Sequence, residues 1–221
     1  MQQLDMINFF GKWREVVDLS VLEGILNTLS AMDNYCPEPQ KVFRAFTECD
    51  YDKLKIVFLG MDPYPQKGVA TGLAFANSIG TKPEDYSPSL RVILDSVKKH
   101  YLDIPNGRLK CDLLSWSSQG VLLLNSALTV KEDNPGSHMQ LWRPFTSSLL
   151  WNISQKKPNT IFVFFGNQAK SFRTFINKSP YLSVMHPSFC ARNNCLLPDI
   201  FTKIDEIMVG QDDAQQLIYW L

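Results

Sequence analysis

The chain has 221 residues, with 22 Lys and Arg against 22 Asp and Glu, and 45% of its residues are hydrophobic. These values fit a globular protein with a full core and exclude a disordered chain, a collagen-like repeat and a disulfide-stapled miniprotein. The apolar runs fall far short of the roughly 20 residues that cross a bilayer, and the first ten residues lack the basic start of a secretory signal. No linker or repeat interrupts the sequence. We therefore expect a single domain over residues 1–221, with neither a membrane span nor secretion.

The five cysteines form no CxxC pair, and their odd number is typical of a reducing compartment. We expect the protein in the cytoplasm of a prokaryote, or in the nucleus or mitochondrion of a eukaryote. The three histidines are not spaced with cysteines or carboxylates as metal ligands usually are. We therefore expect neither a metal ion nor another cofactor.

The charges cancel over the whole chain but are unevenly distributed along it. From Asn134 to Pro198 there is no Asp or Glu, whereas seven basic residues remain. A local positive face is sufficient to bind phosphates, because each neutralised phosphate releases counterions. Acid-free stretches also arise by chance in surface loops, so the charge pattern alone leaves phosphate binding open.

Helices and strands are predicted to alternate along the chain. Val17, Val21, Ile25 and Leu29 have helical spacing, and a second amphipathic pattern follows Pro88 and Ser89. Four continuous apolar runs are typical of strands buried on both faces: Leu54–Leu59, Val121–Leu124, Thr160–Phe165 and Tyr181–Met185. The pattern predicts an α/β protein with three α/β/α layers and a central four-stranded, mainly parallel sheet.

Each predicted strand stops at Gly, Asn or His and opens into a polar loop. Ligands of open α/β sheets bind at the carboxyl ends of the strands. We therefore expect the loops to meet in one pocket that contains Asp62, Tyr64, Asn125, Gly166 and His186. The first loop, GMDPYPQKG, lacks the patterns of nucleotide-binding loops, and its prolines remove amide donors, so it is better suited to fixing side chains.

Four motifs, in this order, resemble those of the family 1, uracil-specific uracil-DNA glycosylases. LGMDPYP resembles the water-activating motif LGQDPYH, GLAFAN resembles GLAFS, GVLLLNSALTV resembles the GVLLLN strand, and HPSFCA resembles the HPSPLS loop. The resemblance spans nearly the whole chain. It implies a monomeric enzyme that hydrolyses the bond between uracil and deoxyribose and leaves an abasic site for base excision repair. The implied partner is uracil-containing DNA, single- or double-stranded, and a uracil-glycosylase inhibitor protein is a further candidate.

Hydrolysis of this bond makes the sugar cationic while the departing base gains negative charge, so a catalyst must stabilise both ends. The carboxylate of Asp62 is the candidate that orients the attacking water and stabilises the sugar cation. The resemblance places His186 at uracil O2, where it would stabilise the leaving anion. Taken alone, each residue has a structural interpretation: an Asp that initiates a turn, and a buried strand-end histidine.

Recognition of uracil requires rejection of cytosine and of thymine. The amide of Asn125 can pair with uracil N3–H and O4, a pattern that cytosine does not match. Tyr64 is placed to exclude the thymine methyl group, and Phe75 resembles the family phenylalanine on which the base stacks. Met61 replaces the usual Gln and is expected to contact the base through its backbone. Either aromatic residue could instead serve only as core packing.

The target nucleotide must rotate out of the duplex, so contacts to the DNA backbone must offset that cost. The resemblance assigns them to three segments that present amides or small polar groups: Pro88 and Ser89; Gly166 and Asn167; and the loop His186–Asn193 with Ser188, Phe189, Cys190 and Arg192.

Two positions depart from the family pattern. Pro65 stands where the family usually has the His of DPYH, and Phe189-Cys190 replaces Pro-Leu. The second change removes the leucine expected to fill the space of the flipped base, for which Phe189, Cys190 and Arg192 are candidates. These departures motivate an alternative: a DNA-binding or replication-accessory protein with this fold and weak or no activity.

Overall fold

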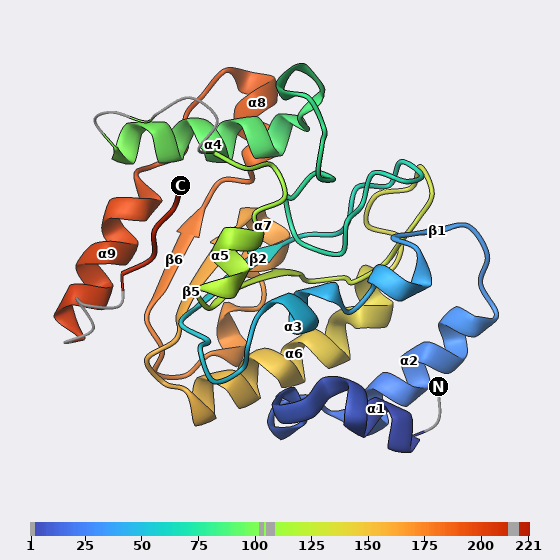
Figure 1. Cartoon of the computed structure of the whole chain (residues 1–221). Coiled ribbons are helices and arrows are strands. Elements are labelled where there is room, and N and C mark those ends of the chain that lie inside the picture. Colours follow the sequence, from blue (N-terminus) through green and yellow to red (C-terminus); the bar gives the residue numbers. More distant parts are fainter. Residues whose placement is uncertain (1–2, 102–103, 105–108, 212–216) are drawn as a thin grey trace.

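A computed structural model of the chain describes residues 3–101, 104, 109–211 and 217–221. Its centre is a parallel sheet with the strand order β3-β2-β5-β6 (Figure 1). These strands confirm the four predicted runs to within two residues at each end: β2 Ile56–Gly60, β3 Val121–Asn125, β5 Ile161–Phe165 and β6 Tyr181–Val184. A short antiparallel pair lies outside the sheet and consists of β1 Tyr35–Cys36 and β4 Val130–Lys131.

The strand register brings the four carboxyl ends to one edge. Gly60 of β2 pairs with Asn125 of β3, and Phe165 of β5 pairs with Val184 of β6. The residues directly after the strands, among them Met61, Ser126 and Gly166, therefore start from the same edge of the sheet.

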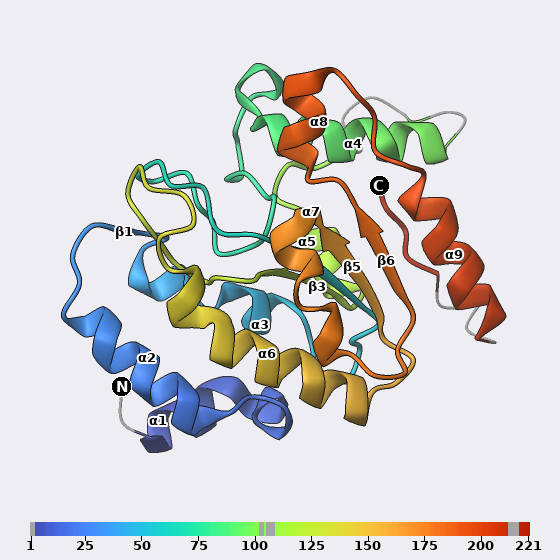
Figure 2. The same ribbon diagram turned by 180° about the vertical axis from the view of Figure 1, so that it is seen from behind.

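Helices cover both faces of the sheet, as the sequence predicted. Figures 1 and 2 place α4, α8 and α9 on one side and α1, α2 and α6 on the other. The nine described α-helices are α1 Gln3–Phe10, α2 Leu19–Ser30, α3 Arg44–Glu48, α4 Pro88–His100, α5 Leu114–Ser118, α6 Met139–Lys156, α7 Gly166–Lys170, α8 Pro187–Asn193 and α9 Ile200–Gly210.

The two amphipathic helices begin at recognisable caps. The carboxylate of Asp18 accepts hydrogen bonds from the amides of Ser20 and Val21 at the start of α2. At the start of α4, Ser87 Oγ accepts from the amide of Leu90, and Pro88 takes the first helical position, where it needs no amide donor. The Ser-Pro sequence thus fixes where α4 starts at the sheet edge.

Two expectations about strand β6 and the segment that follows it are wrong. Strand β6 is not buried on both faces: Tyr181 is 40% exposed, whereas β3, at the opposite end of the strand order, is buried. The segment after it is not a loop, since His186 caps helix α8 and Pro187 takes its first position. The sequence His-Pro-Ser is thus a helix start.

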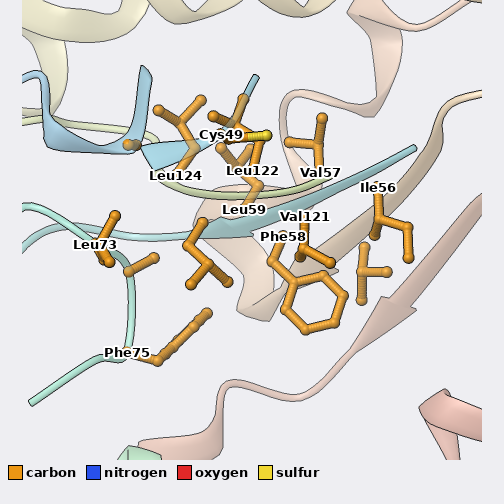
Figure 3. Close-up of a cluster of buried hydrophobic side chains, with 14 of the residues drawn as sticks. Cys49, Ile56, Val57, Phe58, Leu59, Leu73, Phe75, Val121, Leu122 and Leu124 are labelled. Atoms are coloured by element: carbon orange, nitrogen blue, oxygen red, sulfur yellow. The ribbon is translucent and has the colours of Figure 1, made fainter. Parts of the chain in front are cut away.

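The core lies between the sheet and its helices. β2, β3 and β5 are almost wholly apolar, and Figure 3 shows Phe58 and Leu59 of β2 in one cluster with Leu73 and Phe75. Trp220, which is fully buried, stacks on Phe58 at a ring-centroid distance of 5.9 Å. Within the described residues, the helices are too short or too polar to span a membrane, and no group of three potential metal ligands comes together.

Candidate active site

A cleft of about 750 Å³ lies at the carboxyl edge of the sheet. The starts of α4, α7 and α8 and the loop after β2 all contribute to its lining. A small inner pocket adjoins it and shares Asp62, Tyr64, Ser89 and His186 with its wall. Phe75 and Asn125 line this inner pocket. Its own volume of about 30 Å³ is less than a pyrimidine ring needs, so a bound base would also use space in the cleft.

Asp62 follows β2 directly and borders both cavities. Its Oδ2 accepts a hydrogen bond from the amide of Gly136 at 2.6 Å. Burial raises the pKa of Asp62 above its ordinary value of 3.8, and the hydrogen bonds from the Gly136 amide and its own amide act in the opposite direction. The site therefore contains an oriented, partly desolvated carboxyl group.

The contact between Gly136 and Asp62 was not predicted from the sequence. Gly136 has φ +82°, a conformation that other residues rarely adopt, and a Cβ there would lie 3.3 Å from Met61 Cε. The Pro135-Gly136 pair is a turn signal, but nothing in the sequence shows that the turn amide reaches a residue 74 positions away.

Buried hydrogen bonds fix the residues that flank this turn. Trp142 Nε1 donates to Thr129 Oγ1 at 2.7 Å, and Thr129 Oγ1 lies 2.8 Å from His138 Nδ1. Since Thr129 accepts from Trp142, its hydroxyl proton is available to His138 Nδ1. The start of α6 is therefore held against β4, and the turn that contains Gly136 is anchored on both sides.

The loop after β2 is held by its backbone as well. The carbonyl of Met61 accepts from Ser126 Oγ at 2.7 Å and from the amide of Ala127 at 3.0 Å. The carbonyl of Pro65 accepts from the amide of Asp133 at 3.1 Å. Both Met61 and Pro65 line the cleft. These bonds fix the loop on either side of Asp62.

Asn125 and Phe75 meet at Gly60, the last residue of β2. A Cβ at Gly60 would lie 2.5 Å from Asn125 Oδ1 and 3.1 Å from Phe75 Cζ. Phe75 has φ +68° and is 6% exposed, so it belongs to the core and also forms the wall of the inner pocket. Its two interpretations from the sequence, pocket wall and core packing, are therefore compatible.

Tyr64 is fixed at its hydroxyl end. Its hydroxyl donates to the carbonyl of Phe75 at 3.0 Å and lies 2.5 Å from Ser87 Oγ. Burial raises the pKa of Tyr64 to about 12, with a smaller opposite effect from Ser87, so the phenol is neutral. The ring therefore stands as a rigid wall between the inner pocket and the start of α4.

His186 is held through its Nδ1 atom. The amide of Ser188 donates to His186 Nδ1 at 3.2 Å, and Ser188 Oγ lies 2.8 Å from the same nitrogen. An Nδ1 that accepts from an amide carries no proton, so the neutral ring bears its proton on Nε2. Burial, with a smaller effect from the charge of Arg192, lowers the pKa of His186 to about 4. The imidazole is thus a neutral donor at neutral pH.

The residues expected to contact DNA are mostly found around the cleft. Its lining includes Pro88, Ser89, Gly166, Asn167, Ser188 and Arg192. Phe189 lies next to this wall on α8 with 45% of its surface exposed, whereas Cys190 is completely buried. The structure thus removes Cys190 from the surface that could meet DNA. The lining also includes Gln66, Pro135 and Gln168, which the sequence analysis did not single out.

Comparison with known proteins identifies the family of this chain. The Uracil DNA glycosylase superfamily profile matches residues 46–206. A uracil-DNA glycosylase of Borrelia duttonii is 34% identical over 86% of this chain and 89% of its own length. One of Campylobacter lari is 33% identical over 93% of both chains. The chain therefore belongs to the uracil-DNA glycosylase superfamily.

Solved structures of the superfamily confirm the fold. The mimivirus uracil-DNA glycosylase aligns with a TM-score of 0.74 and 24% identity, over 97% of this chain and 85% of its own. The wild-type UNG of Nitratifractor salsuginis aligns with a TM-score of 0.67 and 19% identity over 99% of both chains. The resemblance seen in the four sequence motifs is thus confirmed at the level of family and fold.

Proposed function

We propose that this chain acts as a uracil-DNA glycosylase, a hydrolase that rotates uracil out of DNA, cleaves its N-glycosidic bond and initiates base excision repair. The observation that carries the proposal is the meeting of a partly buried carboxylate and a neutral imidazole donor at one pocket, namely Asp62 and His186. The two groups match the opposite charges that develop in the transition state, positive on the sugar and negative on the departing base, and both are held in place before the substrate arrives.

Asp62 acts on the sugar side of the scissile bond. Its carboxylate orients a water molecule toward the anomeric carbon and stabilises the positive charge that develops on the sugar. The hydrogen bond from the Gly136 amide to Oδ2 orients the carboxylate for this role. Raising the pKa by burial makes the carboxylate a stronger base than an exposed Asp.

His186 acts on the departing base. A neutral imidazole with its proton on Nε2 donates a hydrogen bond to uracil O2 as negative charge accumulates there. An imidazolium would be a stronger acid, but the low pKa of His186 keeps the ring neutral at physiological pH. Stabilisation therefore comes from an oriented hydrogen bond at a half-buried imidazole.

The inner pocket supplies the specificity for uracil. Asn125 accepts from N3–H and donates to O4, and cytosine would leave both groups mismatched. Phe75 provides the stacking face, and the rigid Tyr64 ring excludes the C5 methyl of thymine. Met61 contributes through its backbone at the edge of the cleft.

The rim of the cleft holds the DNA. Pro88 and Ser89, Gly166 and Asn167, and Ser188 contact phosphates beside the flipped nucleotide. We assign to Phe189 the role of filling the space that the flipped base leaves, because it is exposed on α8 and Cys190 is not. Arg192 adds positive charge from the acid-free part of the chain.

The protein works as a monomer of one domain, residues 1–221, on single- or double-stranded DNA. A mimivirus UNG variant with a TM-score of 0.76 to this chain was solved in complex with UGI, so an inhibitor of that kind is a further partner. The alternative, an accessory DNA-binding protein, is not favoured by the family membership.

The test is excision from a uracil-containing oligonucleotide in excess EDTA, followed by alkali. We expect strand cleavage at the uracil, in single and double strands, with purified wild-type protein. Asp62→Asn serves as the inactive control. Tight DNA binding without abasic sites would support the accessory alternative instead, and activity that disappears with EDTA would contradict hydrolysis by side chains alone.

A further inference from the structure

Helix α8 ends in a turn that brings two cysteines together. Asn194 has φ +48° and ψ 40°, and the amide of Cys195 donates to the carbonyl of Cys190 at 3.0 Å. This is the hydrogen bond of a Schellman motif, in which the side chains five positions apart commonly pack on each other. Here both of those side chains carry thiols.

The spacing of the two backbones can be bounded from this hydrogen bond. Adding standard bond lengths on either side of the 3.0 Å contact places the Cα atoms at most about 7 Å apart. A disulfide bridges Cα atoms about 4.4–6.8 Å apart. The turn therefore holds the two Cα atoms close to the distance that a disulfide bridges.

The side chains support the same picture. Cys190 is fully buried, and Cys195 is half-buried and packs against the same core. Burial, and then contact with the Cys195 thiol, raise the pKa of Cys190 to about 11. The two thiols are thus neighbours that differ in solvent exposure. A small reagent can reach the partly exposed Cys195 more easily than the buried Cys190.

The other three cysteines are placed differently. Cys36 lies near the carbonyls of Pro65 and Gln66, Cys49 near that of Asp50, and Cys111 near that of Ser78. Each faces a backbone carbonyl rather than a second thiol. These three cysteines therefore serve as internal controls for the reactivity of Cys190 and Cys195.

We propose that Cys190 and Cys195 form a redox modification site, at which a low-molecular-weight disulfide converts the two thiols into an intrachain disulfide. The Cys195 thiolate attacks one sulfur of the reagent and releases one reagent thiol. The Cys190 thiolate then attacks the sulfur of Cys195, the mixed disulfide breaks, and the second reagent thiol leaves. Two protein thiols are oxidised and one reagent disulfide is reduced.

The modification closes a covalent ring across the end of the helix that carries Ser188, Phe189 and Arg192. The ring encloses Arg192 and fixes the left-handed turn at Asn194. It also protects Cys195 from lasting adducts, because any mixed disulfide at Cys195 is displaced by its neighbour.

The test treats the folded, full-length protein with oxidised glutathione and follows its intact mass. We expect a loss of about 2 Da with no retained glutathione. Peptide mapping should link Cys190 to Cys195, leave Cys36, Cys49 and Cys111 reduced, and show reversal by dithiothreitol.

Two variants make the test specific. Cys190→Ser should stop at a glutathione adduct on Cys195, and Cys195→Ser should leave the buried Cys190 unmodified. A lasting adduct on Cys195 of the wild type, or a disulfide that involves any other cysteine, would overturn the proposal. Both readouts are chemical and are independent of uracil excision.

Discussion

Asp62 has to satisfy two opposing requirements. Catalysis benefits from a carboxylate that is partly shielded from water, whereas folding is disfavoured by a charge in that position. Its pKa is raised, so the folded chain binds this proton more tightly than the unfolded chain does. The stability that this residue contributes is therefore present at low pH and lost as the pH rises through its folded pKa.

Asp62→Asn tests both requirements in one variant. We expect kcat/KM for uracil excision to fall by about 10²–10⁴-fold. Because the buried charge is gone, the thermal unfolding midpoint at pH 7 should rise, and this gain should vanish below pH 3.8. Asp95→Asn, at an exposed ion pair with Lys98, is the matched control and should change neither quantity appreciably. A lower midpoint for Asp62→Asn at pH 7 would contradict the cost of burying this carboxylate.

Tyr64 allows its ring and its hydroxyl to be tested separately. Tyr64→Ala removes the wall, so excision of thymine should become measurable. Tyr64→Phe loses the hydrogen bonds to Phe75 and Ser87 but keeps the ring, so it should still reject thymine. Both variants are compared on oligonucleotides with a single uracil or a single thymine. Equal base preference in the two variants would remove Tyr64 from the specificity pocket.

Asn125→Asp tests hydrogen-bond recognition. A carboxylate accepts from the amino group of cytosine but cannot donate to uracil O4. The ratio of cytosine to uracil excision should therefore rise by about tenfold or more. The measurement uses matched oligonucleotides, and an unchanged ratio would show that Asn125 does not read the base edge.

The side chains of the candidate site were predictable because they end apolar strands or lie in the loops that follow. Asp62, Asn125 and His186 follow this rule, and the sheet edge brings them together. The amide of Gly136 was not predictable, since backbone groups are the same at every residue. The burial of Cys190 was missed because the segment was interpreted as a loop, whereas it forms helix α8 with an inward face.

At the scale of elements, the pairing of β2 with β3 fixes the pocket. Gly60 and Asn125 are partners in the ladder, and Gly60 leaves room for the Asn125 amide and the Phe75 ring. The apolar runs predicted the strands well because a continuous run of apolar residues is a local property of the sequence. The exposure of β6 was not predictable from its run, since it depends on how the rest of the chain covers the strand; β3, the other terminal strand, is buried.

Gly60→Ala should displace the Asn125 and Phe75 side chains that line the inner pocket. The new methyl group would contact Asn125 Oδ1 and Phe75, so we expect kcat/KM to fall by about 10²-fold. Gly24→Ala is the matched control on the exposed face of α2, where nothing lies within 4 Å. It should stabilise the protein by about 0.5–1 kcal/mol and leave excision unchanged. Wild-type kcat/KM in Gly60→Ala would refute the tight contact at this position.

At the scale of the whole molecule, two histidines, the buried His138 and the half-buried His186, make stability depend on pH. Burial lowers the pKa of His138 as well as that of His186, so the unfolded chain takes up protons that the folded chain refuses. The contribution of these two histidines to stability should therefore fall as the pH decreases from 6.5 toward 4. We expect the change in the urea midpoint from pH 7 to pH 5 to be less destabilising in His186→Gln than in the wild type. Parallel curves for the two proteins would exclude His186 as a source of this dependence.

The order of the strands has a consequence for synthesis on the ribosome. Strand β2 is entirely apolar and buried, and both of its neighbours, β3 and β5, come later in the chain. At about 5–20 residues per second, the roughly 100 residues that separate β2 from β5 take about 5–20 s to translate. Throughout that interval the hydrophobic residues 56–60 of the nascent chain lack at least one of the two strands that cover them in the folded protein. We therefore expect this segment to bind chaperones during synthesis.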